Sequence, residues 1–311
     1  MLSLVGHDLL TLGDFTPAQV NAVIERAVMQ KRARKAAVGR VKPLEDKSVA
    51  IIMLKPSLRT RVSFELAVTQ LGGTPVLLVG EGSAFSRNES VYDTVKVLER
   101  YCQMIVLRTF AQSHLEEVAA AASVPVINAL TDDYHPGQVL ADLLTIHEHK
   151  GRLEGLTLAY VGDGNNMANT LLVGGAQVGM NVTVACPPGY EPLKSAVTRA
   201  NEIAATTGSQ LAVVRDPRDA VTGADVVVTD TWASMGQEDE HAQRLAVFTP
   251  YQIDSALMEL AHPEAIFMHC LPAHRGEEVT DEVIDSPASV VFDEAENRMH
   301  AQRALVSLLA G

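Results

Sequence analysis

The chain has 311 residues, 47% of them hydrophobic, so it is long enough to bury two cores of ordinary size. It carries 25 lysines and arginines against 38 aspartates and glutamates, which gives a formal net charge of −13. This excess of negative charge argues against general binding to nucleic acid or to acidic membranes. An anionic ligand would therefore need a local basic pocket.

The cysteines and the N-terminal sequence bear on where the protein works. Cys102, Cys186 and Cys270 have no paired spacing, so the sequence suggests neither a disulfide framework nor a zinc site. The N-terminus lacks a basic segment followed by a long apolar core, and no later stretch approaches the roughly 20 apolar residues that a membrane span needs. We expect a cytoplasmic protein that binds neither membranes nor nucleic acid.

Strand-like and helical segments alternate along the first half of the chain. Apolar runs predict strands at 48–54, 75–79, 104–107 and 125–128. Helical patterns lie near 16–37, 59–71, 90–101, 112–122 and 136–149. This alternation predicts a parallel sheet with helices on both faces and with ligands outside the carboxyl ends of its strands.

The same alternation restarts after the turn-rich residues 150–152. Strands are predicted at 157–161, 181–185, 211–214, 225–229, 265–269 and 289–292, and the last segment, 294–309, is helical. We therefore expect an α/β protein of two doubly wound parallel-sheet domains with the active site in the cleft between them. The expected domains are 1–150, with the helix 294–311 packing back on it, and 151–293.

The run Ser57-Leu58-Arg59-Thr60-Arg61 directly follows the first predicted strand and opens a predicted helix. At a helix N-terminus the first N–H groups lack partners and the helix dipole favours negative charge. Ser57, Thr60 and these amides could wrap a phosphate while Arg59 neutralises it. The alternative is an ordinary capped helix with two solvated arginines.

Two further motifs follow predicted strands in the first half. Arg108 comes after the strand 104–107, and His135-Pro136-Gly137-Gln138 opens the helix that follows the strand 125–128. Because the ends of parallel strands meet at one edge of a sheet, both could reach an anion held by the first loop. Taken alone, an arginine after a strand is more often a surface residue, and His-Pro at a helix start often serves as a simple cap.

The run Gly162-Asp163-Gly164-Asn165-Asn166-Met167 follows a strand and precedes a helix, as in a dinucleotide-binding loop. Met167 replaces the third glycine of that motif, and the expected acidic ribose ligand is absent from 184–187. Asn165 and Asn166 instead offer amides that could hold a carboxylate or an amino group, or they could simply cap the helix.

The remaining motifs follow strands of the second half. Asp230 suits a ligand ammonium group, and Ser234-Met235-Gly236, followed by acidic residues, resembles a mobile lid. Alternatively, the segment is a solvated acidic loop. Cys270 would project from the tip of the strand 265–269, although a lone cysteine there is usually a small buried hydrophobic residue.

Together these motifs resemble the aspartate/ornithine carbamoyltransferase family over nearly the whole chain, and its ornithine-specific members most closely. The matching blocks occur in order and are Ser57–Arg61, Arg108, His135-Pro136-x-Gln138 with Asp142, Gly162–Asn166, Asp230 with Ser234-Met235-Gly236, His269-Cys270-Leu271-Pro272 and Phe292–Arg298. The resemblance implies that 1–150 binds carbamoyl phosphate and that 151–293 binds L-ornithine.

The resemblance also implies roles for single residues. The implied carbamoyl phosphate site consists of Ser57, Leu58, Arg59, Thr60, Arg108, His135, Gln138, Cys270, Leu271 and Arg298. The implied ornithine site consists of Asn166, Asp230, Ser234 and Met235. The catalytic residues would be Arg59, Arg108, His135, Asp230 and Cys270, with no metal ion and no cofactor.

The chain departs from the family pattern at two places. Leu58 stands where many members carry Ser or Thr, so a hydroxyl contact is lost. The backbone N–H of Leu58 can still donate. The segment in which relatives give a side chain to a neighbouring subunit's site offers Ala84 here, with Ser86 or Arg87 as substitutes. Because the family builds its sites at subunit interfaces, we expect a homotrimer or an assembly of trimers.

The implied reaction moves the carbamoyl group from carbamoyl phosphate to the δ-amine of L-ornithine, giving L-citrulline and phosphate, within arginine metabolism. If aspartate were the acceptor, the site would need basic groups to bind its carboxylates, and the acidic Asp230 argues against this alternative. N-acetyl- and N-succinyl-ornithine differ only at the α-amino end, where Asp230 suits a neutral amide poorly. Alternatives from other classes are a nucleotide-binding oxidoreductase and a non-catalytic binding module.

Overall fold

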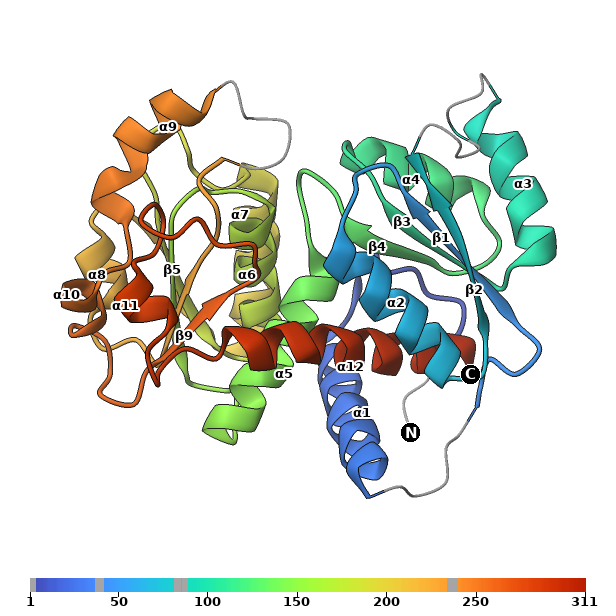
Figure 1. The fold of residues 1–311 in the computed structure, drawn as a ribbon, viewed down its shortest axis with the longest axis horizontal. Coiled ribbons are helices and arrows are strands. Elements are labelled where there is room, and N and C mark those ends of the chain that lie inside the picture. The colour runs from blue at the N-terminus through green and yellow to red at the C-terminus, as the bar shows by residue number, and fades with distance from the viewer. Residues whose placement is uncertain (1–3, 37–41, 81–84, 86–88, 234–239) are drawn as a thin grey trace. The chain divides into compact units, whose positions relative to one another are not determined.

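The computed structural model describes residues 4–36, 42–80, 85, 89–233 and 240–311. The chain splits into two compact units, one formed by Met1–Leu144 with Glu296–Gly311 and the other by Thr145–Ala295 (Figure 1). The division falls inside two helices, α5 (Pro136–Lys150) and α12 (Val291–Ala310).

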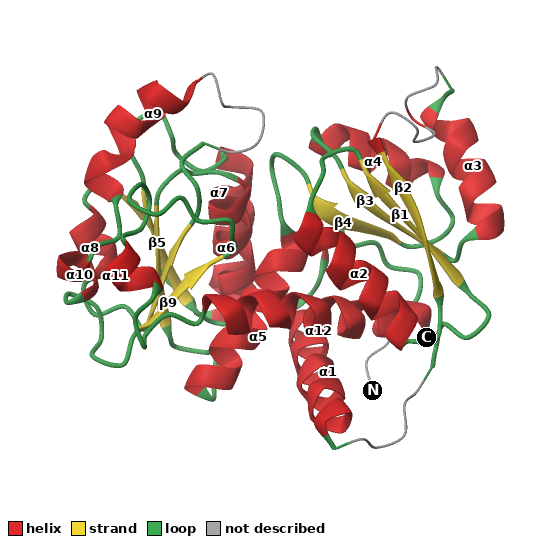
Figure 2. Cartoon of the chain, viewed as in Figure 1, coloured by secondary structure: helices red, strands yellow, loops and turns green. Residues whose placement is uncertain are grey.

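The first unit contains a four-stranded parallel sheet flanked by helices (Figure 2). Its strands lie in the order β2-β1-β3-β4. Their bounds are β1 (Ser48–Met53), β2 (Thr74–Val79), β3 (Met104–Arg108) and β4 (Val126–Leu130). The helices are the 3-10 helix η1 (Leu12–Asp14), α1 (Pro17–Lys35), α2 (Leu58–Gln70), α3 (Val91–Tyr101), α4 (Gln112–Ala121) and the unit's parts of α5 and α12.

Apolar periodicity explains how this unit forms. Strand β1 is buried from its second residue onward and pairs in parallel with β2 and β3. One face of α2 is also buried and carries the predicted residues Phe64, Ala67, Val68 and Leu71. Burial of each large apolar side chain contributes about 1.5–3 kcal/mol. The predicted strand–helix order around the Ser57 motif is therefore confirmed.

The second unit contains a five-stranded parallel sheet in the order β7-β6-β5-β8-β9. Its strands are β5 (Thr157–Val161), β6 (Asn181–Ala185), β7 (Leu211–Val214), β8 (Val226–Thr229) and β9 (Ile266–His269). Its helices are α6 (Asn166–Gln177), α7 (Lys194–Thr207), α8 (Pro217–Val221), α9 (His241–Phe248), the 3-10 helix η5 (Thr249–Tyr251), α10 (Ser255–Met258) and α11 (Asp281–Ile284). The predicted fold class, two doubly wound parallel-sheet domains, is confirmed.

One predicted strand is wrong. The segment 289–292 makes only a single bridge beside β9, in which Phe267 N–H donates to Ala288 and Val290 N–H donates to Phe267. The chain then enters α12 at Val291, earlier than the predicted helix start at residue 294. Acidic residues in the first turn, Asp293 and Glu294, favour a helix N-terminus, and this preference outweighs the β-propensity of the short apolar run.

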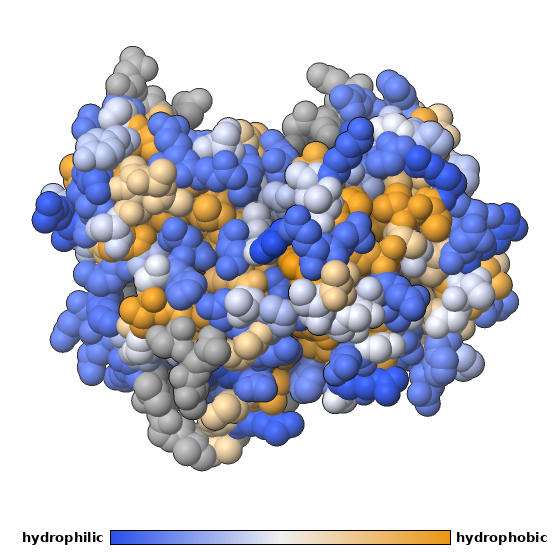
Figure 3. Space-filling model, turned by 180° about the vertical axis from the view of Figure 1, so that it is seen from behind, coloured by the Kyte–Doolittle hydropathy of each residue, from blue (hydrophilic) through white to orange (hydrophobic). Residues whose placement is uncertain are grey.

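The face drawn in Figure 3 carries hydrophilic residues with hydrophobic ones between them. Among the described residues, none of the helices combines the length and the apolar character that crossing a membrane requires.

Candidate functional site

Each sheet has one point at which the strand order reverses, and the predicted site residues lie beside these points. In the first unit β2 and β3 lie on opposite sides of β1, so the chain leaves the ends of β1 and β3 in different directions. In the second unit the reversal lies between β5 and β8. Open parallel sheets bind ligands at such positions, outside the carboxyl ends of the strands.

In the first unit, two buried arginines converge on the hydroxyl of Thr60. Arg108, the last residue of β3, donates from Nη1 to Thr60 Oγ1 over 3.3 Å, and Arg298 of α12 donates from Nη2 over 2.9 Å. Both arginines are less than one-tenth exposed. Two positive charges around one neutral acceptor make this an anion-binding arrangement.

Ser57 and Thr60 stand at the N-terminus of α2, as the sequence predicts. Ser57 is the N-cap, and its Oγ accepts the N–H of Thr60 over 3.3 Å. Leu58 is the first residue of the helix, and its side chain is 75% exposed. Arg59 is half-buried beside it. The positive end of the α2 helix dipole therefore adds to the field of Arg108 and Arg298.

His135 and Gln138 complete this group at the start of α5. Gln138 Oε1 accepts from Arg298 Nη1 over 2.8 Å, and Gln138 Nε2 donates to Asp142 Oδ1 over 2.8 Å. Burial holds the pKa of His135 well below its usual 6.5, and the charges of Arg298 and Arg108 lower that pKa further. His135 is therefore neutral at physiological pH and can donate one N–H without adding charge.

Lys55 is a neighbour of this group that the sequence-based prediction missed. Its side chain is buried after β1, where Nζ forms an ion pair with Asp132 and lies 4.4 Å from the centre of the Phe110 ring. The three residues follow β1, β3 and β4, so Lys55 links the loops at this edge of the sheet. A lysine two residues before Ser57 was the available signal.

In the second unit, Asp230 lies at the reversal point and accepts three hydrogen bonds. Its Oδ1 accepts from Cys270 Sγ over 3.1 Å and from the backbone N–H of Thr231 over 2.8 Å. Its Oδ2 accepts from Asn165 Nδ2 over 2.9 Å. Asp230 is only 8% exposed. These donors hold a carboxylate in place, as binding of an ammonium group requires.

Asn165 contacts Asp230, and the ornithine contact predicted for Asn166 stays a prediction. Asn165 is also the N-cap of α6, where its Oδ1 accepts the N–H of Met167 over 2.9 Å and the Tyr160 hydroxyl over 3.2 Å. Asn166 is the first residue of α6, and its backbone carbonyl accepts from Thr170 Oγ1 over 2.6 Å. The two adjacent asparagines thus occupy different environments.

Cys270 follows β9 and is held there by its neighbours. His269 Nδ1 accepts the N–H of Leu271 over 2.9 Å, so the imidazole donates from Nε2 to Glu278 Oε1 over 3.1 Å. The N–H of His269 donates to Glu294 Oε2 over 2.9 Å. These bonds fix the backbone on both sides of Cys270, whose side chain is partly exposed.

Asp163 supports the loop after β5. Its Oδ2 accepts from Arg244 Nη1 over 2.7 Å, and the same nitrogen donates to the carbonyl of Trp232 over 3.0 Å. Burial raises the pKa of Asp163 to about 6, although Arg244 acts in the opposite direction. Asp163 is thus mainly ionised at neutral pH and ties α9 to this loop. The sequence-based prediction missed Arg244, which lies in no recognised motif.

Glycine at position 164 answers a packing need. A Cβ added at Gly164 would lie 2.3 Å from the backbone of Glu191 and Pro192. The backbone of residues 191–192 therefore leaves no room for a side chain at position 164, and this packing explains the glycine without a bound dinucleotide.

Several predicted residues fall outside the described part of the chain. They are Ser234, Met235 and Gly236 of the expected lid, and Ala84, Ser86 and Arg87 of the segment expected to reach a neighbouring subunit.

A metal ion fits the Asp230 group poorly. Possible ligand atoms of Asp230, His269 and Cys270 lie within 4.8 Å of one another. Both ring nitrogens of His269 are already engaged, one with Leu271 and the other with Glu278. The imidazole therefore offers no lone pair to an ion unless these bonds break.

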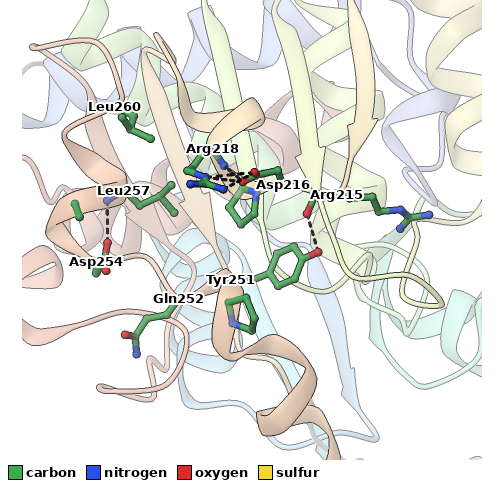
Figure 4. Close-up of a pocket in the computed structure, with 11 residues that line it drawn as sticks. Arg215, Asp216, Arg218, Tyr251, Gln252, Asp254, Leu257 and Leu260 are labelled. Atoms are coloured by element: carbon green, nitrogen blue, oxygen red, sulfur yellow. Dashed lines mark hydrogen bonds and ion pairs between the residues drawn. The ribbon is translucent and has the colours of Figure 1, made fainter.

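A pocket of about 590 Å³ in the second unit contains none of the predicted site residues. Figure 4 shows that Asp216 and Arg218 pair with each other there and that the Tyr251 hydroxyl donates to the carbonyl of Arg215. Arg215 also pairs with Glu191. Because both arginines already have carboxylate partners, this pocket is not favoured as the site for an anionic substrate.

Comparison with known families gives a match for each half of the chain. Residues 7–148 match the carbamoyl-phosphate-binding domain of aspartate/ornithine carbamoyltransferase, and residues 154–309 match its Asp/Orn-binding domain. The chain therefore belongs to the aspartate/ornithine carbamoyltransferase family.

Similar proteins lie within the ornithine branch of the family. The ornithine carbamoyltransferase of Parafrankia sp. is 53% identical over 296 residues, which cover 95% of this chain and 93% of that protein. That of Carboxydothermus hydrogenoformans is 51% identical over 98% of each chain. The solved ornithine carbamoyltransferase of Pyrococcus furiosus is 47% identical with a TM-score of 0.97, and the match covers 100% of this chain and 99% of that one.

Proposed function

We propose that the protein transfers the carbamoyl group of carbamoyl phosphate to the δ-amine of L-ornithine and forms L-citrulline and phosphate. The observation that carries this proposal is the chemistry of the two half-sites. Arg108 and Arg298 meet at Thr60 in one unit, and Asp230 accepts bonds from Asn165 and Cys270 in the other. An acyl phosphate fits the first group, and a diamino acid fits the second.

The phosphate half would stabilise the charge that develops during the reaction. Attack of the amine on the carbonyl carbon makes an oxyanion, which collapses as the C–O bond to phosphate breaks. Arg59, Arg108 and neutral His135 would donate to the oxyanion or to the leaving phosphate. Preorganised donors of this kind contribute about 3–4 kcal/mol each to transition-state stabilisation.

The acceptor half would orient the amine. Ornithine's δ-ammonium has a pKa of ~10.4 in water and must lose a proton before it can attack. Asp230 would bind one ammonium group of ornithine, while Cys270 and Leu271 would lie beside the reacting amine and the carbamoyl group. No covalent enzyme intermediate is needed, because the amine itself is the nucleophile.

The nearest rival function uses an acylated ornithine. N-acetyl- and N-succinyl-ornithine replace the α-ammonium with a neutral amide. Asp230, 8% exposed and already holding three donors, would then lack its cationic partner. Free ornithine is therefore the favoured acceptor.

Citrulline formation tests the proposal directly. Purified protein and carbamoyl phosphate are incubated with L-ornithine and, in parallel, with N-acetyl-L-ornithine, L-aspartate or putrescine. Turnover with L-ornithine alone supports both half-sites. Turnover with a different acceptor overturns the role of Asp230, and an inactive protein overturns the proposed reaction.

We also propose a homotrimer, or an assembly of trimers, that acts in arginine metabolism in the cytoplasm. Large apolar side chains on α2 and on the edge strand β2 support self-association, because they are more than one-third exposed: Leu58, Val62, Leu66, Val76 and Val79. Light scattering coupled to size-exclusion chromatography measures the assembly, and a mass of one 33.4 kDa chain would contradict it.

A further inference from the structure

Two histidines and two glutamates lie together where the segment after β9 meets the start of α9. We name them the His–Glu cluster, and its members are His241, His274, Glu277 and Glu278. Possible ligand atoms of His274, Glu277 and Glu278 lie within 4.8 Å of one another. His241, the first residue of α9, places Nε2 3.1 Å from Glu277 Oε2.

The carboxylate of Glu278 has one oxygen whose hydrogen-bonding capacity is unsatisfied by the described part of the chain, which indicates a place for a cation. Its side chain is fully buried, and Oε1 is bonded by His269 Nε2 over 3.1 Å and by the N–H of His274 over 2.5 Å. Its second oxygen, Oε2, is buried and has no hydrogen-bond partner among the described residues. An unsatisfied buried carboxylate oxygen is costly, and a nearby cation would remove that cost.

The guanidinium of Arg275 does not supply this compensation. Arg275 lies within the same segment, but its guanidinium bonds Asp281 over 2.7 Å and Asp285 over 2.6 Å. The imidazole of His274 and the carboxylate of Glu277 are 43% and 27% exposed, so an ion can reach them from solvent. The cluster is therefore buried on one side and open on the other.

We propose that the His–Glu cluster binds one divalent transition-metal ion, with Zn²⁺ as the best match. Imidazole ligands favour Zn²⁺ and its neighbours over Ca²⁺ and Mg²⁺, which prefer all-oxygen sites. Two imidazoles with one or two carboxylates make an ordinary zinc ligand set. The proposed site shares no residue with the proposed substrate site, so it stands independently of the proposed reaction.

Bound Zn²⁺ would link α9 to the segment after β9, because His241 belongs to the former and the other three ligands belong to the latter. The Asp230–His269–Cys270 group is the competing position for the same ion. The two positions differ in one ligand type, since only the competing group contains a thiol.

Isothermal titration of the whole protein with ZnCl₂ tests the proposal. We expect one ion per chain, and the variant H274Q should bind it at least about tenfold more weakly, as loss even of outer-shell partners weakens metal sites by 10–100-fold. The variant H262Q alters an exposed histidine of the same unit and should bind like the wild type. Unaltered Zn²⁺ affinity in H274Q would overturn the proposal.

Cobalt substitution distinguishes the two positions. Co²⁺ in the His–Glu cluster should give visible d–d bands without the thiolate-to-cobalt charge-transfer band in the near ultraviolet. The variant C270S should keep both the Co²⁺ spectrum and the Zn²⁺ affinity. A thiolate band that disappears in C270S would assign the ion to the Asp230 group and would overturn the proposal, as would the absence of any metal binding.

Discussion

The guanidinium of Arg298 lies 2.8 Å from Gln138 Oε1, although the two residues are 160 positions apart in the chain. The same guanidinium reaches Thr60 Oγ1 over 2.9 Å. One planar group thus joins the N-terminal turns of α2 and α5, the two helices that carry the Ser57 and His135 motifs. The C-terminal helix therefore supplies the residue that joins these two motifs, to which we assign the binding of the phosphate.

The variant R298K should weaken both binding and stability. A lysine amine cannot reproduce two bonds from one rigid fork, so the partner atoms on Thr60 and Gln138 lose a charged donor. We expect the free energy of unfolding to fall by about 1.5–3 kcal/mol, which lowers the melting temperature. We also expect the KM for carbamoyl phosphate to rise. Calorimetry and steady-state kinetics measure the two effects, and a variant unchanged in both would refute this arrangement.

The variant R59A should lose activity while keeping its fold. Arg59 is half-buried at the start of α2, and we assign it to the transferred group. Loss of one such donor should lower kcat about 10²–10³-fold. The matched control is R61A, because Arg61 is exposed and pairs with Glu65 over 3.4 Å. Near wild-type turnover in R59A would contradict the assignment of Arg59 to the carbamoyl phosphate site.

Local patterns in the sequence account for most of the fold. The apolar runs of β1 and β5 are buried almost throughout, and the stripe that contains Phe64 and Leu71 forms one buried face of a helix, so these patterns specify their elements. The run 289–292 failed because four apolar or small residues fit both a strand and the first turn of a helix. The deciding influence there was the acidic start of α12.

The site was less predictable where its contacts join distant parts of the chain. The motif residues Arg108 and Asp230 lie at strand ends, and Thr60 lies in the first turn of the helix after β1; such boundaries are visible in a sequence. Asn165 meets Asp230 across 65 positions, and Arg244 meets Asp163 across 81 positions. Periodicity carries no information about such pairings.

The pH dependence of stability should reveal neutral His135. Its pKa in the folded protein lies below the usual 6.5. Below about pH 6.5, His135 therefore binds a proton in the unfolded chain but stays neutral in the folded protein. The contribution of neutral His135 to stability is thus complete above about pH 6.5 and is lost as the pH falls toward the lowered folded value.

The melting temperature of the variant H135Q should therefore fall less than that of the wild type when the pH is lowered from about 6.5 to about 5. Differential scanning calorimetry in matched buffers measures the two slopes. The variant H262Q, which alters an exposed histidine, should follow the wild type. Parallel curves for H135Q and the wild type would show that His135 titrates normally.

The variant D230N should impair the acceptor half alone. An amide keeps the shape of Asp230 but removes the negative charge that we assign to the ammonium of ornithine. We expect the KM for L-ornithine to rise at least about tenfold, which corresponds to 1.4 kcal/mol, while the affinity for carbamoyl phosphate stays unchanged. Isothermal titration with carbamoyl phosphate and ornithine-dependent kinetics test the two halves separately. Equal losses for both substrates would contradict the division of roles.

The variant G164A should destabilise the second unit. A Cβ at this position would lie 2.3 Å from the backbone of Glu191 and Pro192, and backbone atoms cannot move aside as a flexible side chain can. We expect a loss of about 3 kcal/mol, the upper part of the range for overpacking. The control G137A lies in α5 with its nearest contact at 3.9 Å, so it should be neutral or slightly stabilising. Urea unfolding compares the two, and a G164A protein as stable as G137A would show that this loop has room for a side chain.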